Sequence, residues 1–163
     1  MSLVELLTNE RIALSATVAS KKRALELSSQ LLASHQANLV QNEIFDSLLS
    51  RERLGSTGLG GGVAIPHGRV AGIDKAVAAF IQLKEGVDFD AIDQQPVDLV
   101  FALLVPQEAT DEHLQILATL AEAFKRPELR QALRQAKDIE TLLTLLSNGS
   151  NSGGASEVYS SAI

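Results

Sequence analysis

Cysteine and tryptophan are both absent from this chain of 163 residues, and aromatic residues make up only 4% of it. Without cysteine the chain can form neither disulfides nor zinc–thiolate sites, and thiol catalysis is excluded. The scarcity of aromatic side chains predicts an aliphatic core and leaves no stacking platform for single-stranded nucleic acid. A composition of 45% hydrophobic and 21% charged residues is that of an ordinary globular protein with one sizeable core.

The chain also lacks an excess of positive charge and any apolar run long enough to span a membrane. Its net charge is −6 and its isoelectric point is near 5.0, which argues against nucleic acid or an anionic membrane as a partner. The first residues, MSLVELLTNERIAL, carry acids where a signal peptide carries bases. We therefore expect a cytoplasmic protein without membrane insertion.

Hydrophobic periodicity predicts helices at both ends of the chain and strands between them. The expected helices cover 20–35, 39–55, 110–124, 126–135 and 138–148, and the expected strands cover 63–65, 76–83 and 97–106. The two longer strands are near-continuous apolar runs, which are typical of strands covered on both faces. Residues 86–96 suit either an edge strand or a loop. The order of elements predicts an α/β fold in which a sheet is sandwiched between helices.

Three finer features complete the predicted organisation. The glycine-rich stretch GSTGLGGG (55–62) is expected to be a mobile or tightly turned loop. Residues 1–147 are predicted to form one domain, and the Gly/Ser/Asn-rich residues 148–163 a disordered tail. The helix over 110–124 has an apolar stripe that predicts its buried face. The stripe consists of Leu114, Leu117, Leu120, Ala121 and Phe124.

One of the three histidines of the chain, His67, follows three glycines in GGGVAIPHGR (60–69). It lies where the strand over 63–65 ends, and ligand-binding groups of open α/β sheets favour strand ends. Pro66 stiffens the approach to the ring, and Gly68 lets another molecule come close to it. A neutral imidazole, with a pKa of about 6.5, can accept a phosphoryl group near neutral pH. Spacing alone favours the alternative, an ordinary histidine of a surface loop.

Two further residues suit the same chemistry. His113 falls in the first turn of its helix, where unpaired N–H groups favour a nearby phosphate; a partly buried histidine that bonds a backbone carbonyl is the alternative. Arg51 precedes the glycine stretch and can grip a phosphate with two parallel N–H bonds. Alternatively, it is a solvated residue paired with Glu52. Arg53 and Arg69 are weaker candidates for holding a phosphate.

The glycine stretch itself carries further candidates. Ser56 and Thr57 can donate hydroxyl hydrogen bonds to an anion, although both also suit an ordinary turn. The stretch is not a nucleotide loop, because no Gly-Lys-Ser/Thr ends it and it does not lead from a strand into a helix as a dinucleotide fingerprint does. We therefore set NTP and NAD binding aside. The third histidine, His35, is expected at a helix end as a capping or surface residue.

The segment RERLGSTGLGGGVAIPHG (51–68) closely resembles the phosphorylation-site region of type-2 IIA domains of the bacterial phosphoenolpyruvate-dependent phosphotransferase system, the mannitol/fructose class. The resemblance is nearest to the nitrogen-regulatory branch and covers about residues 2–147. SKKRALEL (20–27), DFDAIDQQPVDLVFALLVP (88–106) and HLQILATLAEAF (113–124) support it. Gly61 stands where many relatives have asparagine, and the tail has no counterpart.

The resemblance implies an α/β fold with a mixed sheet flanked by helices. It implies that His67 is the phosphorylated residue, that Arg51 contacts the phosphoryl group or its donor, and that His113 orients or hydrogen-bonds the phosphate. It requires no metal and no cofactor. The remaining expected contacts to the phosphate or its donor are Ser56, Thr57 and Gly68.

The resemblance also implies a phosphotransferase, charged by the phosphohistidine of a small HPr-like carrier that docks on aliphatic residues such as Leu59 and Val63. The first hypothesis is a regulatory phosphocarrier of the nitrogen-related system, with protein targets such as potassium transporters or sensor kinases. The second is a IIA component of a fructose- or mannitol-type sugar transporter that passes phosphate to a separate IIB protein. The third is a binding module that has lost phosphotransfer, against which the intact His67, Arg51 and His113 argue.

Overall fold

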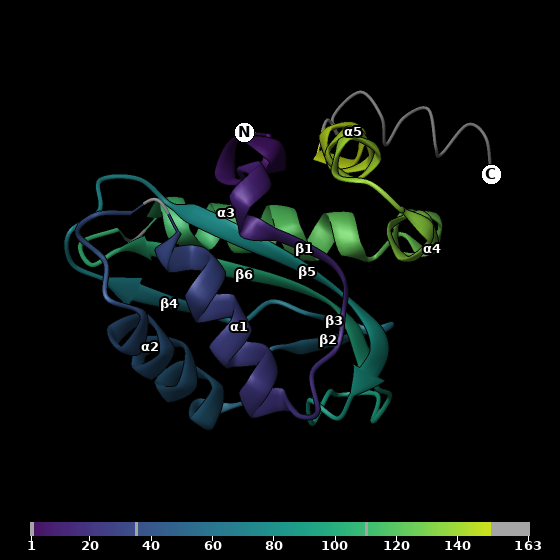
Figure 1. Cartoon of the computed structure of the whole chain (residues 1–163), viewed down its shortest axis with the longest axis horizontal. Coiled ribbons are helices and arrows are strands. Elements are labelled where there is room, and N and C mark those ends of the chain that lie inside the picture. Colours follow the sequence, from purple (N-terminus) through teal and green to yellow (C-terminus); the bar gives the residue numbers. More distant parts are fainter. Residues whose placement is uncertain (1, 35, 110, 151–163) are drawn as a thin grey trace.

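The computed structural model of the chain describes residues 2–34, 36–109 and 111–150, whose arrangement is shown in Figure 1. The helices in these ranges are η1 (Leu3–Leu6), η2 (Asn9–Arg11), α1 (Lys21–Ala33), α2 (Gln41–Leu54), α3 (Asp111–Phe124), α4 (Pro127–Gln135) and α5 (Ile139–Ser150). The strands are β1 (Ile12–Ala16), β2 (Gly58–Gly60), β3 (Val63–Ala64), β4 (His67–Val70), β5 (Val77–Val87) and β6 (Val97–Pro106).

The six strands form one mixed sheet. Its order is β1-β5-β6-β3-β2, and β4 also pairs with β6. Strands β5 and β6 are antiparallel, whereas β1 is parallel to β5 and both β3 and β4 are parallel to β6. The predicted strands over 76–83 and 97–106 correspond to β5 and β6, which have neighbours on both edges. The stretch 86–96 belongs to β5 as far as Val87 and is a loop from Asp88 onward.

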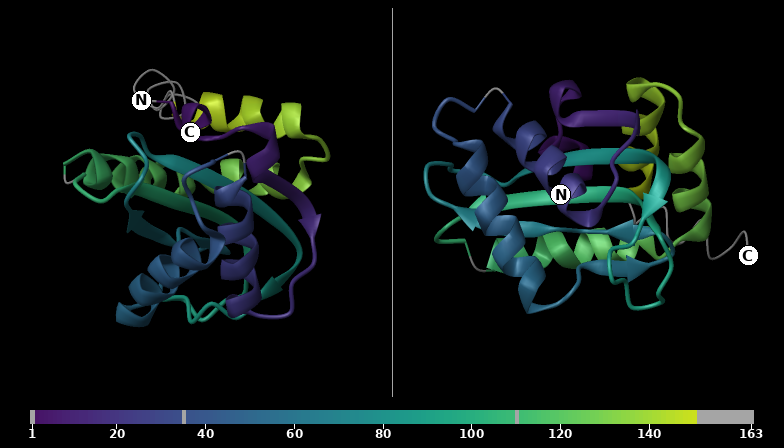
Figure 2. Two further views of the ribbon diagram at one scale, coloured as in Figure 1. Left: turned by 60° about the vertical axis from the view of Figure 1, so that its left-hand side comes forward. Right: turned by 60° about the horizontal axis from the view of Figure 1, so that its bottom comes forward.

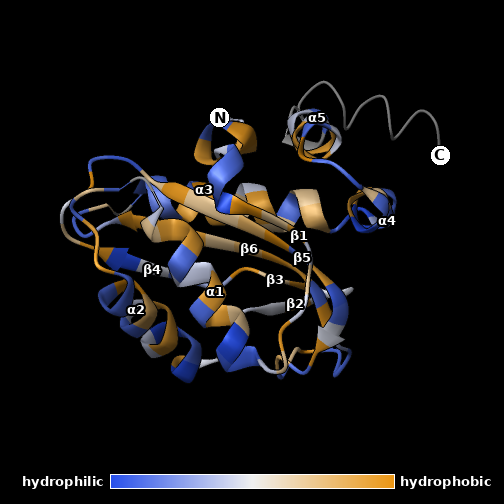
Figure 3. Ribbon diagram, in the orientation of Figure 1, coloured by the Kyte–Doolittle hydropathy of each residue, from blue (hydrophilic) through white to orange (hydrophobic). Residues whose placement is uncertain are grey.

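Side chains of β5 and β6 alternate between two apolar cores. Phe80 and Phe101 belong to the core shared with α3, α4 and α5, whereas Ile81 and Val100 belong to the core shared with α1 and α2. Figure 2 shows these two groups of helices on opposite faces of the sheet, and Figure 3 shows the apolar central strands between them. The predicted α/β class, with a mixed sheet sandwiched between helices, is confirmed.

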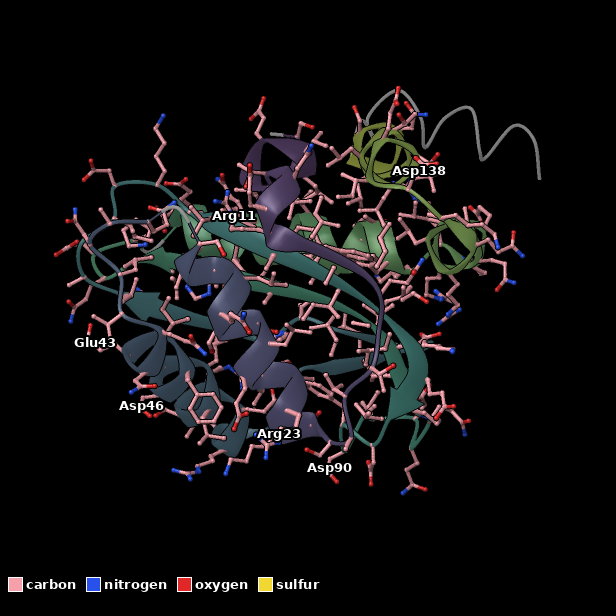
Figure 4. The ribbon with its side chains drawn as sticks, in the orientation of Figure 1. Arg11, Arg23, Glu43, Asp46, Asp90 and Asp138 are labelled. Carbon is pink, nitrogen blue, oxygen red and sulfur yellow. The ribbon has the colours of Figure 1, made fainter. Side chains whose placement is uncertain are left out.

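Local signals in the sequence fix the beginnings of three helices. The Ser20 hydroxyl accepts the N–H of Arg23 at 3.2 Å and caps α1. The Asp138 carboxylate, labelled in Figure 4, accepts the N–H of Thr141 at 2.7 Å and caps α5. Pro127 is the first residue of α4, where its missing N–H costs no intrahelical bond.

The buried face of α3 differs from the predicted stripe. Leu114 is 66% exposed, whereas Ile116 and Ala123 are buried together with Leu120 and Phe124. Apolar residues occupy so much of this helix that they form two overlapping stripes. Packing on the sheet selects one of them, and Leu114 is left on the surface.

The glycine-rich stretch takes the tightly turned form of the two that were predicted, and it also contributes a short strand. Its second half forms β2, which turns back into β3 as an antiparallel pair. Gly61 and Gly62 form the turn with φ values of 66° and 82°, a conformation that side chains rarely adopt. A Cβ on Gly61 would also lie 2.7 Å from Nε of Arg130, so a larger residue there requires the arginine to move.

The end of the predicted domain needs a small correction. Helix α5 runs to Ser150, so residues 148–150 are helical rather than disordered. The rest of the predicted tail, residues 151–163, and His35 lie outside the described residues, and the division into a domain and a tail stays a prediction. Within the described ranges, no helix has the length and apolar character needed to cross a membrane.

The buried side chain of Gln82 on β5 links α4 to the sheet by hydrogen bonds. Its Nε2 donates to the carbonyls of Leu133 and Ala136, each at 2.8 Å. Its Oε1 accepts the N–H of Ser15 at 2.9 Å. Because Ser15 has a φ of 52° inside β1, the same amide also supports a residue in an unfavourable backbone conformation.

We expect Gln82→Leu to lower the free energy of unfolding by about 2–4 kcal/mol, because the backbone groups that bond its amide lose their buried partner. The matched control is Gln131→Leu on the exposed side of α4, which should change it by less than about 0.5 kcal/mol. Chemical denaturation measures both variants. Equal effects of the two substitutions would contradict this role of Gln82.

Candidate functional site

His67 is the first residue of β4 and is only 7% exposed. Strand β3 ends at Ala64, and Pro66 has no N–H to donate to β6. Its carbonyl nevertheless accepts the N–H of Leu103 at 2.9 Å, and His67 then pairs with Leu103. The predicted strand end is therefore a break between two strands that follow the same edge of β6, and His67 opens the second.

A backbone carbonyl fixes the protonation of the His67 ring. Its Nδ1 lies 2.9 Å from the carbonyl oxygen of Ile65. A carbonyl oxygen only accepts hydrogen bonds, so Nδ1 carries the ring hydrogen and Nε2 keeps its lone pair. The sequence left undetermined which ring nitrogen is free, whereas in this geometry Nε2 is the nitrogen with an available lone pair.

His113 lies in the first turn of α3 beside His67. The two rings pack edge to face, with centroids 5.4 Å apart and planes at 68°. On one side of its ring, Nδ1 of His113 is 3.2 Å from Nη2 of Arg69. On the other side, Nε2 is buried without a hydrogen-bond partner among the residues that the structure describes. The hydrogen-bond partner of His113 is therefore an arginine side chain and not the backbone carbonyl considered as the alternative.

Arg51 lies in the last turn of α2, and its Nη1 donates to the carbonyl of Gly55 at 2.8 Å. The alternative in which Arg51 pairs with Glu52 does not hold, because Glu52 forms its ion pair with Lys21, at 2.9 Å. The charge of Arg51 lowers the pKa of both histidines, so it acts within electrostatic reach of both rings. The structure thus brings together the three residues expected to form the site.

Burial is the main reason why the pKa of His67 lies below its ordinary value. The backbone bond and the charge of Glu52 oppose this shift, and Arg51 adds to it. Burial also lowers the pKa of His113, and the neighbouring His67, Arg69 and Arg51 lower it further. Both imidazoles are therefore neutral near pH 7, as a nitrogen nucleophile requires.

The hydroxyls of Ser56 and Thr57 are engaged elsewhere. Ser56 Oγ donates to the carbonyl of Phe89 at 2.6 Å and accepts the N–H of Gly58 at 3.0 Å. Thr57 is buried, and its Oγ1 donates to the carboxylate of Glu52 at 2.6 Å. A hydroxyl has a single hydrogen, so neither residue offers the free donor expected for a phosphate. Both instead hold the segment that joins α2 to β2.

Sequence reasoning missed the role of Glu52. Its buried carboxylate accepts the N–H of Thr57 at 2.9 Å and pairs with Lys21. This places α1, α2 and the glycine-rich segment around one ion pair, and the charge of Glu52 reaches His67. A signal was present, because Glu52 continues the buried positions Ile44 and Leu48 at helical spacing. An acid on an apolar face requires a partner.

The structure shows one reason for a glycine at position 68. A Cβ at this position would collide with the Ser47 hydroxyl and lie 3.2 Å from the Ser47 carbonyl carbon. The close approach is therefore that of helix α2, and the glycine is buried. The expectation that Gly68 contacts an incoming molecule or phosphate stays a prediction.

Of the two residues expected to dock a partner, only one lies on the surface. Val63 is fully buried and cannot contact a partner, whereas Leu59 is 39% exposed. Two aliphatic side chains next to site residues are more exposed than Leu59. Leu54, at the end of the helix that carries Arg51, is 85% exposed, and Leu114, adjacent to His113, is 66% exposed.

Comparisons with known proteins show the family of the chain. Residues 5–149 match the family described as "Phosphoenolpyruvate-dependent sugar phosphotransferase system, EIIA 2". A nitrogen regulatory protein of Pseudomonas aeruginosa is 42% identical over 144 residues, which cover 88% of this chain and 94% of that protein. The crystal structure of nitrogen regulatory protein IIA-Ntr from Neisseria meningitidis is similar with a TM-score of 0.82 and 46% identity, over 87% of this chain and 97% of that one.

A more distant similarity concerns a complex. Enzyme IIA mannitol of Escherichia coli, solved together with phosphorylated enzyme IIB mannitol, matches this chain with a TM-score of 0.71 and 26% identity. The match covers 86% of this chain and 96% of that one. The sheet and its flanking helices are therefore shared beyond the nitrogen regulatory proteins.

We expect an NMR titration of the ring protons to give midpoints below about 6.5 for His67 and His113, because burial disfavours the imidazolium form. Arg51→Gln should raise both midpoints, since it removes a cation, whereas Arg53→Gln on the exposed surface should leave them unchanged. The folded protein should lose stability as the pH falls below about 6.5, because unfolded imidazoles bind protons more readily. Midpoints at or above the ordinary value would contradict this electrostatic account.

Proposed function

The chain belongs to the EIIA 2 family of the phosphoenolpyruvate-dependent sugar phosphotransferase system, and on that premise we propose that it is a regulatory phosphocarrier that accepts a phosphoryl group on His67. The observation that carries the proposal is the hydrogen bond between Nδ1 of His67 and the Ile65 carbonyl. It leaves Nε2 unprotonated, next to His113 and within the field of Arg51.

In the proposed transfer, the Nε2 lone pair of His67 forms a bond to phosphorus while the phosphorus–nitrogen bond of the donor phosphohistidine breaks. The departing donor nitrogen keeps that electron pair. The Nδ1 hydrogen stays on His67, so the step exchanges no proton. The phosphorylated ring gains positive charge, which strengthens its bond to the Ile65 carbonyl.

Positioning and charge stabilisation supply most of the catalysis in phosphoryl transfer. Arg51 provides a positive charge close to both histidines. Nε2 of His113 is a buried atom without a partner among the described residues, and an N–H there would donate to a phosphoryl oxygen on His67. Ser56, Thr57 and Gly68 contribute by holding the surrounding segments in place.

The regulatory role rests on the similarity to nitrogen regulatory proteins. We propose a small HPr-like carrier as the phosphate donor, with the exposed Leu54, Leu59 and Leu114 around the site as its docking surface. A phosphate adds negative charge and acceptor oxygens, which can switch the binding of other proteins. The proposed targets are potassium transporters and sensor kinases, which the protein would meet in the cytoplasm.

A second candidate is a IIA component of a fructose- or mannitol-type sugar transporter. The similarity to enzyme IIA mannitol, solved with its phosphorylated IIB partner, favours it. The identity of 26% to that protein is well below the 42% and 46% to the nitrogen regulatory proteins. Phosphate transfer from the charged protein to a separate IIB domain, which a regulator should not support, distinguishes the two.

The test is phosphoryl transfer from phosphoenolpyruvate through enzyme I and an HPr-like carrier, followed by intact mass. We expect one phosphoryl group on the wild type and none on His67→Ala. His113→Ala should still take up one group, but about 10²–10³-fold more slowly, because one oxyanion donor is lost. Labelling of His67→Ala, or no labelling of the wild type by any such donor, would contradict the proposal and leave a binding module as the better account.

A further inference from the structure

Arg69 is the third residue of β4, two positions after His67. Side chains of a strand alternate between its faces, so Arg69 follows His67 on the same face of the sheet. The backbone of Arg69 pairs with Val105 of β6. A rigid strand therefore sets the spacing between the two side chains, and the guanidinium extends from the element that carries the proposed phosphate acceptor.

The guanidinium of Arg69 joins three parts of the chain. Its Nη1 donates to the carbonyls of Ala109 and, at 3.1 Å, Gln107 in the connection between β6 and α3. Its Nη2 lies 3.2 Å from Nδ1 of His113 in the first turn of α3. Both terminal nitrogens are thus engaged with the loop and the helix that present His113.

The bond between Arg69 and His113 has only one possible direction. A guanidinium has hydrogen-bond donors and no acceptor, so Nδ1 of His113 must accept. The hydrogen of the neutral ring is therefore on Nε2. A charged imidazolium would have no lone pair for Arg69 and would face its positive charge. The lowered pKa of His113 agrees with this, since burial, His67, Arg69 and Arg51 all disfavour the charged ring.

The two imidazoles consequently hold opposite tautomers. His67 donates through Nδ1 to the Ile65 carbonyl and presents a lone pair at Nε2. His113 accepts at Nδ1 from Arg69 and presents an N–H at Nε2, which is buried and has no partner within the described ranges. With the ring centroids 5.4 Å apart, this N–H is available to an oxygen of a phosphoryl group on His67.

We propose that Arg69 is a positioning residue that holds His113 in the Nε2–H tautomer and thereby supplies the hydrogen-bond donor for the phosphoryl group on His67. The proposal rests on the proposed phosphorylation of His67 and adds a residue that does not itself contact the phosphate. Arg69 was a weak candidate for binding the phosphate directly; in the structure its terminal nitrogens contact Gln107, Ala109 and His113.

The first part of the test observes the tautomer without any transfer reaction. Long-range ¹H–¹⁵N NMR near pH 8, where both imidazoles are neutral, should show the hydrogen of His113 on Nε2 in the wild type. Arg69→Met keeps a long side chain but has no donor, and it should give a mixture of tautomers. The control Arg53→Gln, on the exposed surface, should leave His113 unchanged. A pure Nε2–H tautomer in Arg69→Met would overturn the proposal.

The second part measures the rate of phosphate uptake from the HPr-like carrier. Arg69→Met should be roughly tenfold slower than the wild type, as is typical when the partner that orients a histidine is removed, but it should still end with one phosphoryl group on His67. Arg69→Lys, which retains a donor and the charge, should recover part of the rate. In a His113→Ala background, Arg69→Met should cause no further loss.

The outcomes separate this proposal from the phosphocarrier function. A loss of rate in Arg69→Met that persists without His113 would mean that Arg69 acts on the phosphate or its donor directly, and would overturn the positioning role. An unchanged rate would overturn it as well. Failure of the wild type to take up phosphate would contradict the proposed function, while the tautomer measurement would still decide whether Arg69 fixes His113.

Discussion

The break between β3 and β4 is the constraint on which the site depends. Both strands follow one edge of β6, and the chain leaves that ladder only around Ile65 and Pro66. Because Pro66 has no N–H, the ladder cannot continue through it, although its carbonyl still bonds to β6. The Ile65 carbonyl becomes available to the ring of His67, two residues later. One interruption in a buried sheet therefore places the histidine, fixes its tautomer and leaves the lone pair of Nε2 free for the proposed reaction.

The surrounding charges complement this arrangement. The chain as a whole is acidic, with a net charge of −6, which disfavours the arrival of a phosphoryl dianion. At the site, the positive charge of Arg51 at the end of α2 opposes this effect, whereas Arg69 on β4 bonds His113. Burial keeps both imidazoles neutral, so His67 has a lone pair available near pH 7. The ion pair of Glu52 with Lys21 holds the adjoining segment without bonding to either histidine.

Much of the fold could be predicted from the sequence, and the predictions that failed did so for physical reasons. Apolar runs identified β5 and β6 because both faces of these strands are covered. The flanking glycines and proline alone did not distinguish His67 from an ordinary loop histidine, and the prediction of the site came from the resemblance over residues 51–68.

The sequence could not predict to which groups the side chains donate their hydrogen bonds, or which residues fill the space beside the glycines. Hydroxyls at 56 and 57 do not reveal that Phe89 and Glu52 take their hydrogens. The glycine at 68 indicates crowding but not that Ser47 causes it. The roles of Glu52 and Arg69 depend on contacts between elements distant in sequence, which no local pattern encodes. The measurement that tests the account most directly is the phosphorus–nitrogen coupling in ¹⁵N-labelled, phosphorylated protein. We predict coupling to Nε2 of His67, with the hydrogen still on Nδ1; coupling to Nδ1 of His67, or to another residue, would contradict it.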